Sequence, residues 1–169
     1  MANKNWTKTS IKIPSGYSAA ERRSIAQDFV DYIVDRTRKG KGKDGEAWTG
    51  EAGKYSEAYK KSFEFKAKTS KSKVTLELFG DMLSSIEQIS NTPGKVSIGI
   101  KKGDEDYGKA EGNIRGTYGK KSPIAGKARP FMDLSPTEIR KILQPYKAKK
   151  TREELAAAFA AARAIVDET

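Results

Sequence analysis

The sequence predicts an α+β fold in which a long N-terminal helix packs on a small antiparallel sheet, with long loops and C-terminal helices. Two observations predict it. Residues 18–38 begin with a capping serine and carry apolar side chains at helical spacing. Residues 87–101 contain two strand-like segments joined by a Pro-Gly turn, which is typical of a β-hairpin. The length of 169 residues suits one domain with extended arms.

The N-terminal part, residues 1–17, is predicted to be an extended arm. A short strand is expected at Ile11–Ile13, because apolar and polar residues alternate there before Pro14. Ser18 and Glu21 then have the spacing of a capping box, so the first helix should begin at this serine.

The first helix presents Ile25, Phe29, Tyr32 and Ile33 on one face. We expect it to end near Arg38, with Gly40 as the stop. A flexible basic loop should follow near 39–47, because its three glycines oppose helix formation.

Trp48 stands alone in a polar stretch, and we expect its ring to plug the packing of its own domain. A large aromatic in a loop can also anchor a partner, which is the alternative. A second, short helix is predicted at 55–66, with Tyr55, Tyr59 and Phe63 on one face.

A second flexible, basic loop is expected near 66–73. Residues 74–78 alternate as a strand would, although an irregular lead-in is the alternative. Gly80 ends this segment, and Asp81 is expected to cap a single helical turn. That turn would plug the core with three apolar residues: Met82, Leu83 and Ile86.

The third flexible segment is a long, glycine-rich loop near 102–128, with a short helix near Asp106–Gly112 as an option. Phe131 is predicted to be a core anchor, because Pro130 fixes φ and holds the chain extended. A helix should begin at Ser135, and Pro145 should end or kink it before a last, alanine-rich helix. The predicted parts are an arm at 1–17, one α+β domain at 18–147 and a C-terminal helix at 148–169.

The composition argues against catalysis. Histidine and cysteine are both absent, which removes the commonest general base and all thiolate chemistry. No nucleotide-binding glycine motif is present. Adjacent carboxylates in Asp104–Asp106 point in different directions and make a poor metal site. We expect no enzyme activity, no metal and no cofactor; a histidine-free carboxylate nuclease is the enzyme hypothesis that remains.

The net charge is +11, from 33 Lys and Arg against 22 Asp and Glu. This balance favours contact with nucleic acid, or it keeps a lysine-rich surface soluble. Many basic residues lie in predicted loops, so a DNA contact should be loose and independent of sequence. The absence of cysteine fits a reducing cytoplasm. We expect neither a signal peptide nor a membrane span, since no run of ~18 apolar residues occurs.

Several short segments occur in an order that carries a family resemblance. Trp48 and the tyrosines at 55–59 come first. Residues 76–86, LELFGDMLSSI, and residues 129–135, RPFMDLS, flank a strand-like Val96–Gly99 and a variable loop. Together they resemble the tailed-phage virion morphogenesis, tail-completion or neck proteins, over roughly 48–143. The family often has a histidine in the variable loop, which this chain lacks, and both terminal segments are unmatched.

The resemblance implies a non-enzymatic subunit of the virion, assembled in the host cytoplasm and placed at the head–tail junction. It implies a homo-oligomeric ring of six- or twelve-fold symmetry around the passing genomic DNA. Further partners would be other neck and tail proteins: the connector or stopper, the tail terminator, and the sheath or tube. A free, sequence-independent nucleic-acid-binding protein is the alternative function.

The resemblance also suggests roles for particular residues. The structural motif would comprise Trp48, Gly80, Asp81, Met82, Leu83, Ile86, Arg129, Pro130 and Phe131. Some lysines of the loops at 66–73 and 103–127 would face the DNA channel: Lys71, Lys73, Lys120, Lys121 and Lys127. We expect these loops to be mobile in the free subunit and ordered in the ring, because glycine and like charge oppose folding alone.

Overall fold

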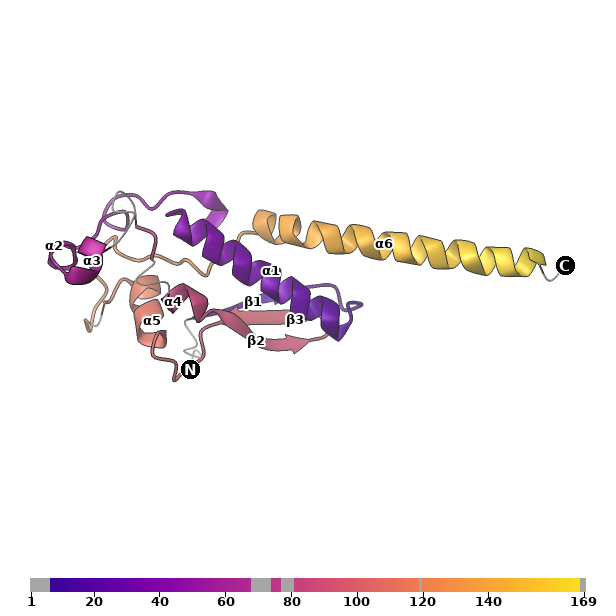
Figure 1. The fold of residues 1–169 in the computed structure, drawn as a ribbon, viewed down its shortest axis with the longest axis horizontal. Coiled ribbons are helices and arrows are strands. Elements are labelled where there is room, and N and C mark those ends of the chain that lie inside the picture. Colours follow the sequence, from indigo (N-terminus) through magenta and orange to yellow (C-terminus); the bar gives the residue numbers. More distant parts are fainter. Residues whose placement is uncertain (1–6, 68–73, 77–80, 119, 168–169) are drawn as a thin grey trace. The chain divides into compact units, whose positions relative to one another are not determined.

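The computed structural model describes residues 7–67, 74–76, 81–118 and 120–167. It has the predicted α+β class, with a three-stranded antiparallel sheet and a long helix, α1 at Ala19–Arg38, that lies along it (Figure 1). The chain divides into two compact units, Met1–Ser135, which holds the sheet, and Pro136–Thr169, which holds the last helix. The C-terminal helix predicted at 148–169 lies within the second of these units.

Helix α1, Ala19–Arg38, begins at the predicted capping box. The Ser18 hydroxyl accepts a hydrogen bond from the Glu21 N–H (3.2 Å), and the Glu21 carboxylate accepts one from the Ser18 N–H (2.7 Å). Both bonds satisfy N–H groups that a helix start leaves unpaired. Three residues of the predicted apolar face are fully buried, namely Ile25, Phe29 and Ile33, whereas Tyr32 is half-buried. The chain leaves the helix at Gly40, whose φ of 72° suits glycine.

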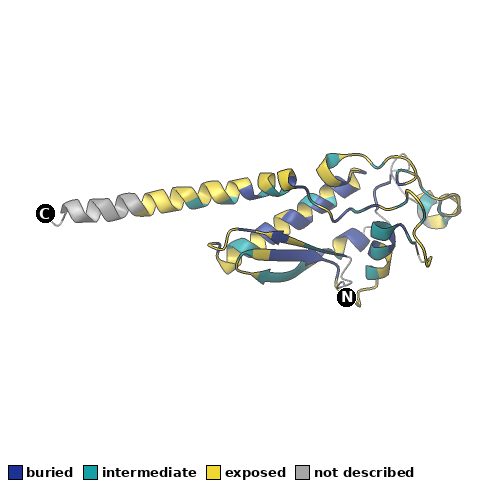
Figure 2. Cartoon of the chain, turned by 180° about the vertical axis from the view of Figure 1, so that it is seen from behind, coloured by how far each residue is buried: buried dark blue, intermediate teal, exposed yellow. Residues whose placement is uncertain are grey.

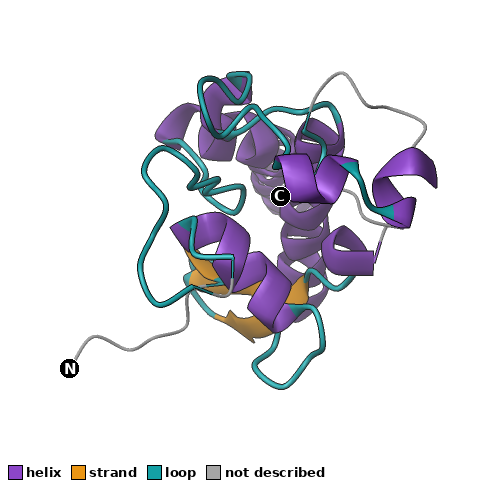
Figure 3. Ribbon diagram, turned by 90° about the vertical axis from the view of Figure 1, so that its left-hand side faces the viewer, coloured by secondary structure: helices purple, strands orange, loops and turns teal. Residues whose placement is uncertain are grey.

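Three strands form the sheet in the order β1–β3–β2, namely β1 Lys8–Lys12, β3 Lys95–Gly99 and β2 Glu87–Thr92. They lie side by side in one small sheet (Figure 3). The β2–β3 hairpin and its turn confirm the prediction, and Gly94 supplies the left-handed φ of 79°. Helix α1 packs against β2 and β3. Buried residues gather where α1 meets the sheet (Figure 2). Val96 and Ile98 of β3 are fully buried.

Strand β1 shows that residues 8–12 belong to the sheet, so the prediction of an arm is wrong for this segment. The strand pairs antiparallel with β3 along its whole length. Ile11 is buried in the core, and the Thr9 hydroxyl donates to the Met132 carbonyl (2.8 Å). Because Lys8, Thr9 and Ser10 also pair with β3, the strand begins before the predicted Ile11 and ends at Lys12.

The loop after α1 closes on itself through a bridge between Lys41 and Ala47 and a 3₁₀ turn, η1, at Lys43–Gly45. The Trp48 ring lies directly against Gly42, where a side-chain carbon would come within 2.7 Å of the indole. Trp48 therefore packs within its own unit, as predicted.

The aromatic segment forms two short helices, α2 Glu57–Lys60 and α3 Phe63–Ala67, where one was predicted. Tyr55, Tyr59 and Phe65 form a cluster with ring centroids 5.1–5.5 Å apart. Phe63 is 78% exposed, so its predicted place on this face is wrong. The break at Lys61 and Ser62 ends the helical period, and Phe65 replaces Phe63 in the cluster.

Val74, Thr75 and Leu76 are buried but form no strand, and Leu76 has a φ of 53°. This irregular lead-in was the alternative to a strand; the rest of it, with Gly80, lies outside the described residues. Helix α4, Asp81–Ser84, is the predicted single turn. Its apolar residues are buried as expected: Met82, Leu83 and Ile86.

Helix α5, Tyr107–Arg115, confirms the optional helix in the long loop and extends it by one turn. Helix α6, Pro136–Asp167, is continuous through Pro145, so the predicted break into two helices is wrong. A proline removes one helical hydrogen bond, which costs ~3 kcal/mol. The alanine-rich stretch 156–162 has the highest helix propensity and continues the helix beyond that defect.

Candidate functional site

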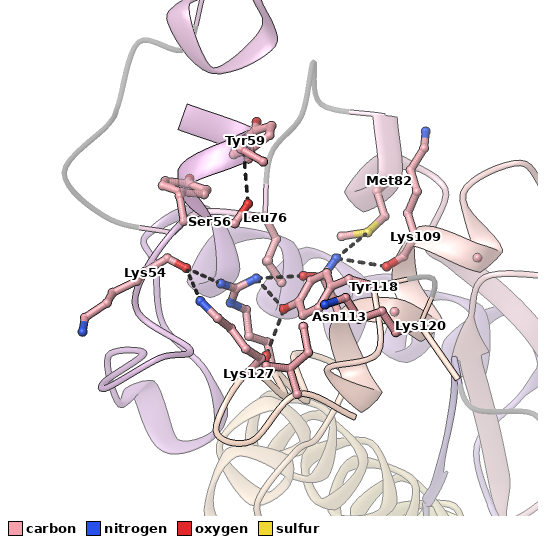
Figure 4. Close-up of a pocket in the computed structure, with 16 residues that line it drawn as sticks. Lys54, Ser56, Tyr59, Leu76, Met82, Lys109, Asn113, Tyr118, Lys120 and Lys127 are labelled. Atoms are coloured by element: carbon pink, nitrogen blue, oxygen red, sulfur yellow. Dashed lines mark hydrogen bonds between the residues drawn. The ribbon is translucent and has the colours of Figure 1, made fainter. Parts of the chain in front are cut away.

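A pocket of about 710 Å³ lies between the aromatic segment, α4, α5 and the loop that follows α5 (Figure 4). Its wall is mostly apolar and comes from segments far apart in the sequence. Four aliphatic side chains contribute to it: Ala58, Leu76, Met82 and Ile124. Three tyrosines and four lysines complete most of the wall: Tyr55, Tyr59, Tyr118, Lys54, Lys109, Lys120 and Lys127.

Arg129 is the polar centre of this wall and is only 5% exposed. Its Nε donates to the Ala52 carbonyl (2.6 Å), and Nη2 donates to the Lys54 carbonyl (2.9 Å). Nη1 donates to the Asn113 side chain (3.1 Å) and to the Tyr118 hydroxyl (2.6 Å). The guanidinium thus joins three separate segments. Because all three guanidinium nitrogens already donate to these acceptors, Arg129 cannot bind a phosphate in the bidentate manner typical of arginine.

Tyr118 extends the network. Its hydroxyl accepts from Arg129 and donates to the Lys127 carbonyl (2.9 Å), while the guanidinium carbon lies 5.5 Å from its ring centroid. Tyr118 is 38% exposed, and its hydroxyl has a hydrogen-bond partner as donor and as acceptor. Burial raises the pKa of Tyr118, although the Arg129 charge acts in the opposite direction. Burial also lowers the pKa of Arg129.

Three of the four lysines are already paired within the unit. Lys54 and Lys127 both contact the Glu51 carboxylate, at 3.1 and 3.2 Å. The hydrogen bond from Lys54 and, to a smaller extent, the one from Lys127 lower the pKa of Glu51. Lys109 pairs with the buried Asp106 at 2.5 Å. Lys120 is exposed and lines the pocket.

The acidic group at 104–106 has a structural role. Asp106 accepts hydrogen bonds from the Ser85 hydroxyl (3.0 Å) and from Lys109, and its own N–H donates to Asp104 (2.8 Å). These bonds join the α4 segment to the start of α5. Among the described residues, no group of three acidic side chains is placed to hold a metal ion. None of the described helices is long and apolar enough to cross a membrane.

The structure brings the two resemblance segments together, because Met82 and Arg129 line the same pocket. Pro130 is half-buried, and Phe131 is fully buried, as its predicted anchor role requires. Arg36 of α1 donates to the Phe131 carbonyl (2.8 Å) and also to the Asp133 carbonyl, so α1 holds this segment from the other side.

The predicted channel lysines differ in their surroundings. Lys120 and Lys121 are exposed. The Lys127 side chain is only 13% exposed and is bound to Glu51, which makes it a poor phosphate ligand. Lys71 and Lys73 lie outside the described residues.

Sequence reasoning missed the network itself. Arg129 was part of a motif, but nothing local points to its acceptors, and the Ala52 carbonyl lies 77 residues earlier. Tyr118 and Asn113 were not singled out either. The only signal was an arginine directly before Pro130 and a core phenylalanine, since an arginine in a buried segment needs carbonyl partners.

Comparisons with protein-family models, with curated proteins and with solved structures found no match. The features of the chain itself that bear on its function are the apolar pocket, the Arg129 network and the exposed lysines.

Proposed function

We propose that the protein is a structural subunit of the tailed-phage head–tail junction, a neck or tail-completion protein. It forms a ring around the DNA channel and joins the tail to the head. The observation that carries the proposal is the ordered pair of segments 76–86 and 129–135, which resemble that family. Their described residues serve packing and cross-linking of loops, with Leu83 and Phe131 in the core and Arg129 between three segments. Such use suits a structural subunit.

Contact with DNA is the second part of the proposal. Lys120 and Lys121 are adjacent, exposed and follow α5. Lysines of this kind attract phosphates weakly, without regard to sequence, and the attraction falls as salt rises. Weak attraction suits a channel, because tight binding would hinder passage of the genome.

One observation favours the alternative of a free nucleic-acid-binding protein. Helix α6 carries a group of basic residues on exposed or half-exposed positions: Lys147, Lys149, Lys150 and Arg152. A helix with such charges can follow a phosphate backbone without any ring.

Light scattering on the purified protein separates the two. A closed assembly of six or twelve subunits supports the ring. A monomer that binds DNA in a salt-sensitive manner supports the alternative, and a monomer without DNA binding contradicts both.

Fluorescence anisotropy with labelled duplex DNA tests the lysines. The double substitution Lys120→Gln and Lys121→Gln should reduce the slope of log affinity against log salt by ~1.8, since each phosphate contact contributes ~0.9. Lys127→Gln is the matched control and should leave the slope unchanged, because Lys127 is bound to Glu51. Equal slopes for all three proteins would contradict a role of Lys120 and Lys121.

A further inference from the structure

Pro145 lies inside α6 at the point where the surroundings of the helix change. Among the residues of α6 whose side chains the structure describes, 136–157, the buried ones both precede this proline: Glu138 and Leu143. From 146 to 157, all residues are exposed or half-exposed. Pro145 therefore separates a packed base, 136–144, from an exposed outer segment, 146–157.

The helix has a weak joint at this boundary. Pro145 has no N–H to donate to the carbonyl of Lys141, and its ring crowds that same carbonyl. Sharp kinks in helices occur mostly at such positions. Helix α6 nevertheless runs through Pro145 as one uninterrupted helix (Figure 1). Because the outer segment is exposed, its packing does not fix the angle at the joint.

The outer segment is itself well suited to remain helical. An i,i+4 ion pair joins Lys149 to Glu153 across one turn (3.6 Å) and adds a little support. The alanines that begin at Ala156 have the highest helix propensity. Bending should therefore be concentrated at Pro145 rather than spread along the helix.

The outer segment also carries a group of cationic residues directly after the joint: Lys147, Lys149, Lys150 and Arg152. We infer that Pro145 is a hinge about which the outer segment turns as a unit, so that these cations align along the phosphates of a DNA duplex. Attraction to phosphates does not depend on sequence and needs only that the charges follow the backbone. The hinge goes beyond the proposed function, whereas its use rests on the proposed contact with DNA.

The absence of cysteine allows spin labels to be placed in the full chain. Thr137→Cys and Leu155→Cys put one label on each side of Pro145, at exposed positions. The two positions are on the same side of the helix and ~27 Å apart along an unbent axis. Double electron–electron resonance should give a broad distance distribution with Pro145. With Pro145→Ala, the distribution should narrow and centre near ~27 Å.

The matched control is Gln144→Ala, which introduces the same residue at the adjacent, exposed position. It should leave the distribution broad, because Gln144 has the backbone N–H that proline lacks. Equal widths for Pro145 and Pro145→Ala, or the same narrowing with Gln144→Ala, would overturn the hinge.

Hydrogen exchange distinguishes a hinge from an outer segment that has melted. If the segment turns as a unit, its amide protons at 150–157 should exchange more slowly than the same amides in the unfolded protein. Exchange at the unfolded rate throughout 150–157 would mean that the segment is not a rod, and the inference would be wrong.

The same labelled protein tests the use of the hinge. Duplex DNA at low salt should narrow the distribution, because phosphate contacts select one direction of the outer segment. Replacement of its four cationic residues by glutamine should abolish this narrowing and leave the distribution without DNA broad. A distribution that stays broad when fluorescence anisotropy shows saturated binding would overturn the use. Absence of any DNA binding would instead contradict the proposed contact with DNA, while Pro145→Ala still decides the hinge.

Discussion

Arg129 and Phe131 stabilise the same segment in different ways. Phe131 is fully buried and contributes by packing. Arg129 satisfies two backbone carbonyls and two side-chain acceptors that would otherwise lose water without gaining a partner. The stability of this segment therefore depends on both the geometry and the charge of the Arg129 guanidinium.

Arg129→Lys tests this dependence on geometry. Lysine keeps the charge but cannot reach all four acceptors, so the free energy of unfolding should fall by ~2–4 kcal/mol. Urea denaturation measures the change. Arg140→Lys, at an exposed position on α6, is the control and should change stability by less than ~0.5 kcal/mol. A comparable effect of both substitutions would contradict the scaffold role of Arg129.

Phe131→Ala tests the core anchor. Truncation of a fully buried phenylalanine should cost ~3–5 kcal/mol, which lowers the melting temperature strongly in a small domain. Phe63→Ala is the matched control, since Phe63 is 78% exposed. The anchor role would be wrong if thermal unfolding were the same for Phe131→Ala and the wild type.

Ionisation of Tyr118 should lower the stability of the fold at alkaline pH. Its pKa is raised by burial above the ordinary value of 10.0, so the folded state holds the phenolic proton more tightly. The resulting stability is present below pH 10 and is lost as pH rises through the folded pKa. In an absorbance titration, Tyr118→Phe should lack one tyrosine that ionises above the ordinary value in the folded wild type. Equal numbers of such late-titrating tyrosines in the folded wild type and in folded Tyr118→Phe would contradict the raised pKa of Tyr118.

At the scale of elements, the parts with local signals were predictable. The Ser18 capping box sets the start of α1, and the Pro-Gly turn sets the β2–β3 hairpin. The errors concern positions decided by distant contacts. Strand β1 exists because β3 pairs with it, and Phe63 is exposed because Phe65 fills the aromatic cluster. The acceptors of Arg129 had no local signal at all, so the pocket was not predictable.

Ser18→Ala tests the capping box of α1. Loss of the hydroxyl leaves the Glu21 N–H without its acceptor, so stability should fall by ~1 kcal/mol. Ser15→Ala, three residues earlier in the exposed turn, should have almost no effect. Chemical denaturation compares the two, and equal stability would contradict the capping role.

In the molecule as a whole, the basic residues divide into two groups. The net charge of +11 is spread over the chain, and the structure distinguishes lysines that are paired within the fold from exposed lysines that we propose contact phosphate. Lys54, Lys109 and Lys127 belong to the first group, and Lys120 and Lys121 to the second. A ring subunit needs both kinds: charges that hold its loops and charges that face the DNA.

Negative-stain electron microscopy of the purified protein tests the central claim most directly. If the protein is a ring subunit, the images should show closed rings of uniform diameter and six- or twelve-fold symmetry, with a central hole wide enough for a DNA duplex. Particles of monomer size, or open chains of variable length at every concentration, would contradict a subunit that forms a ring around the DNA channel.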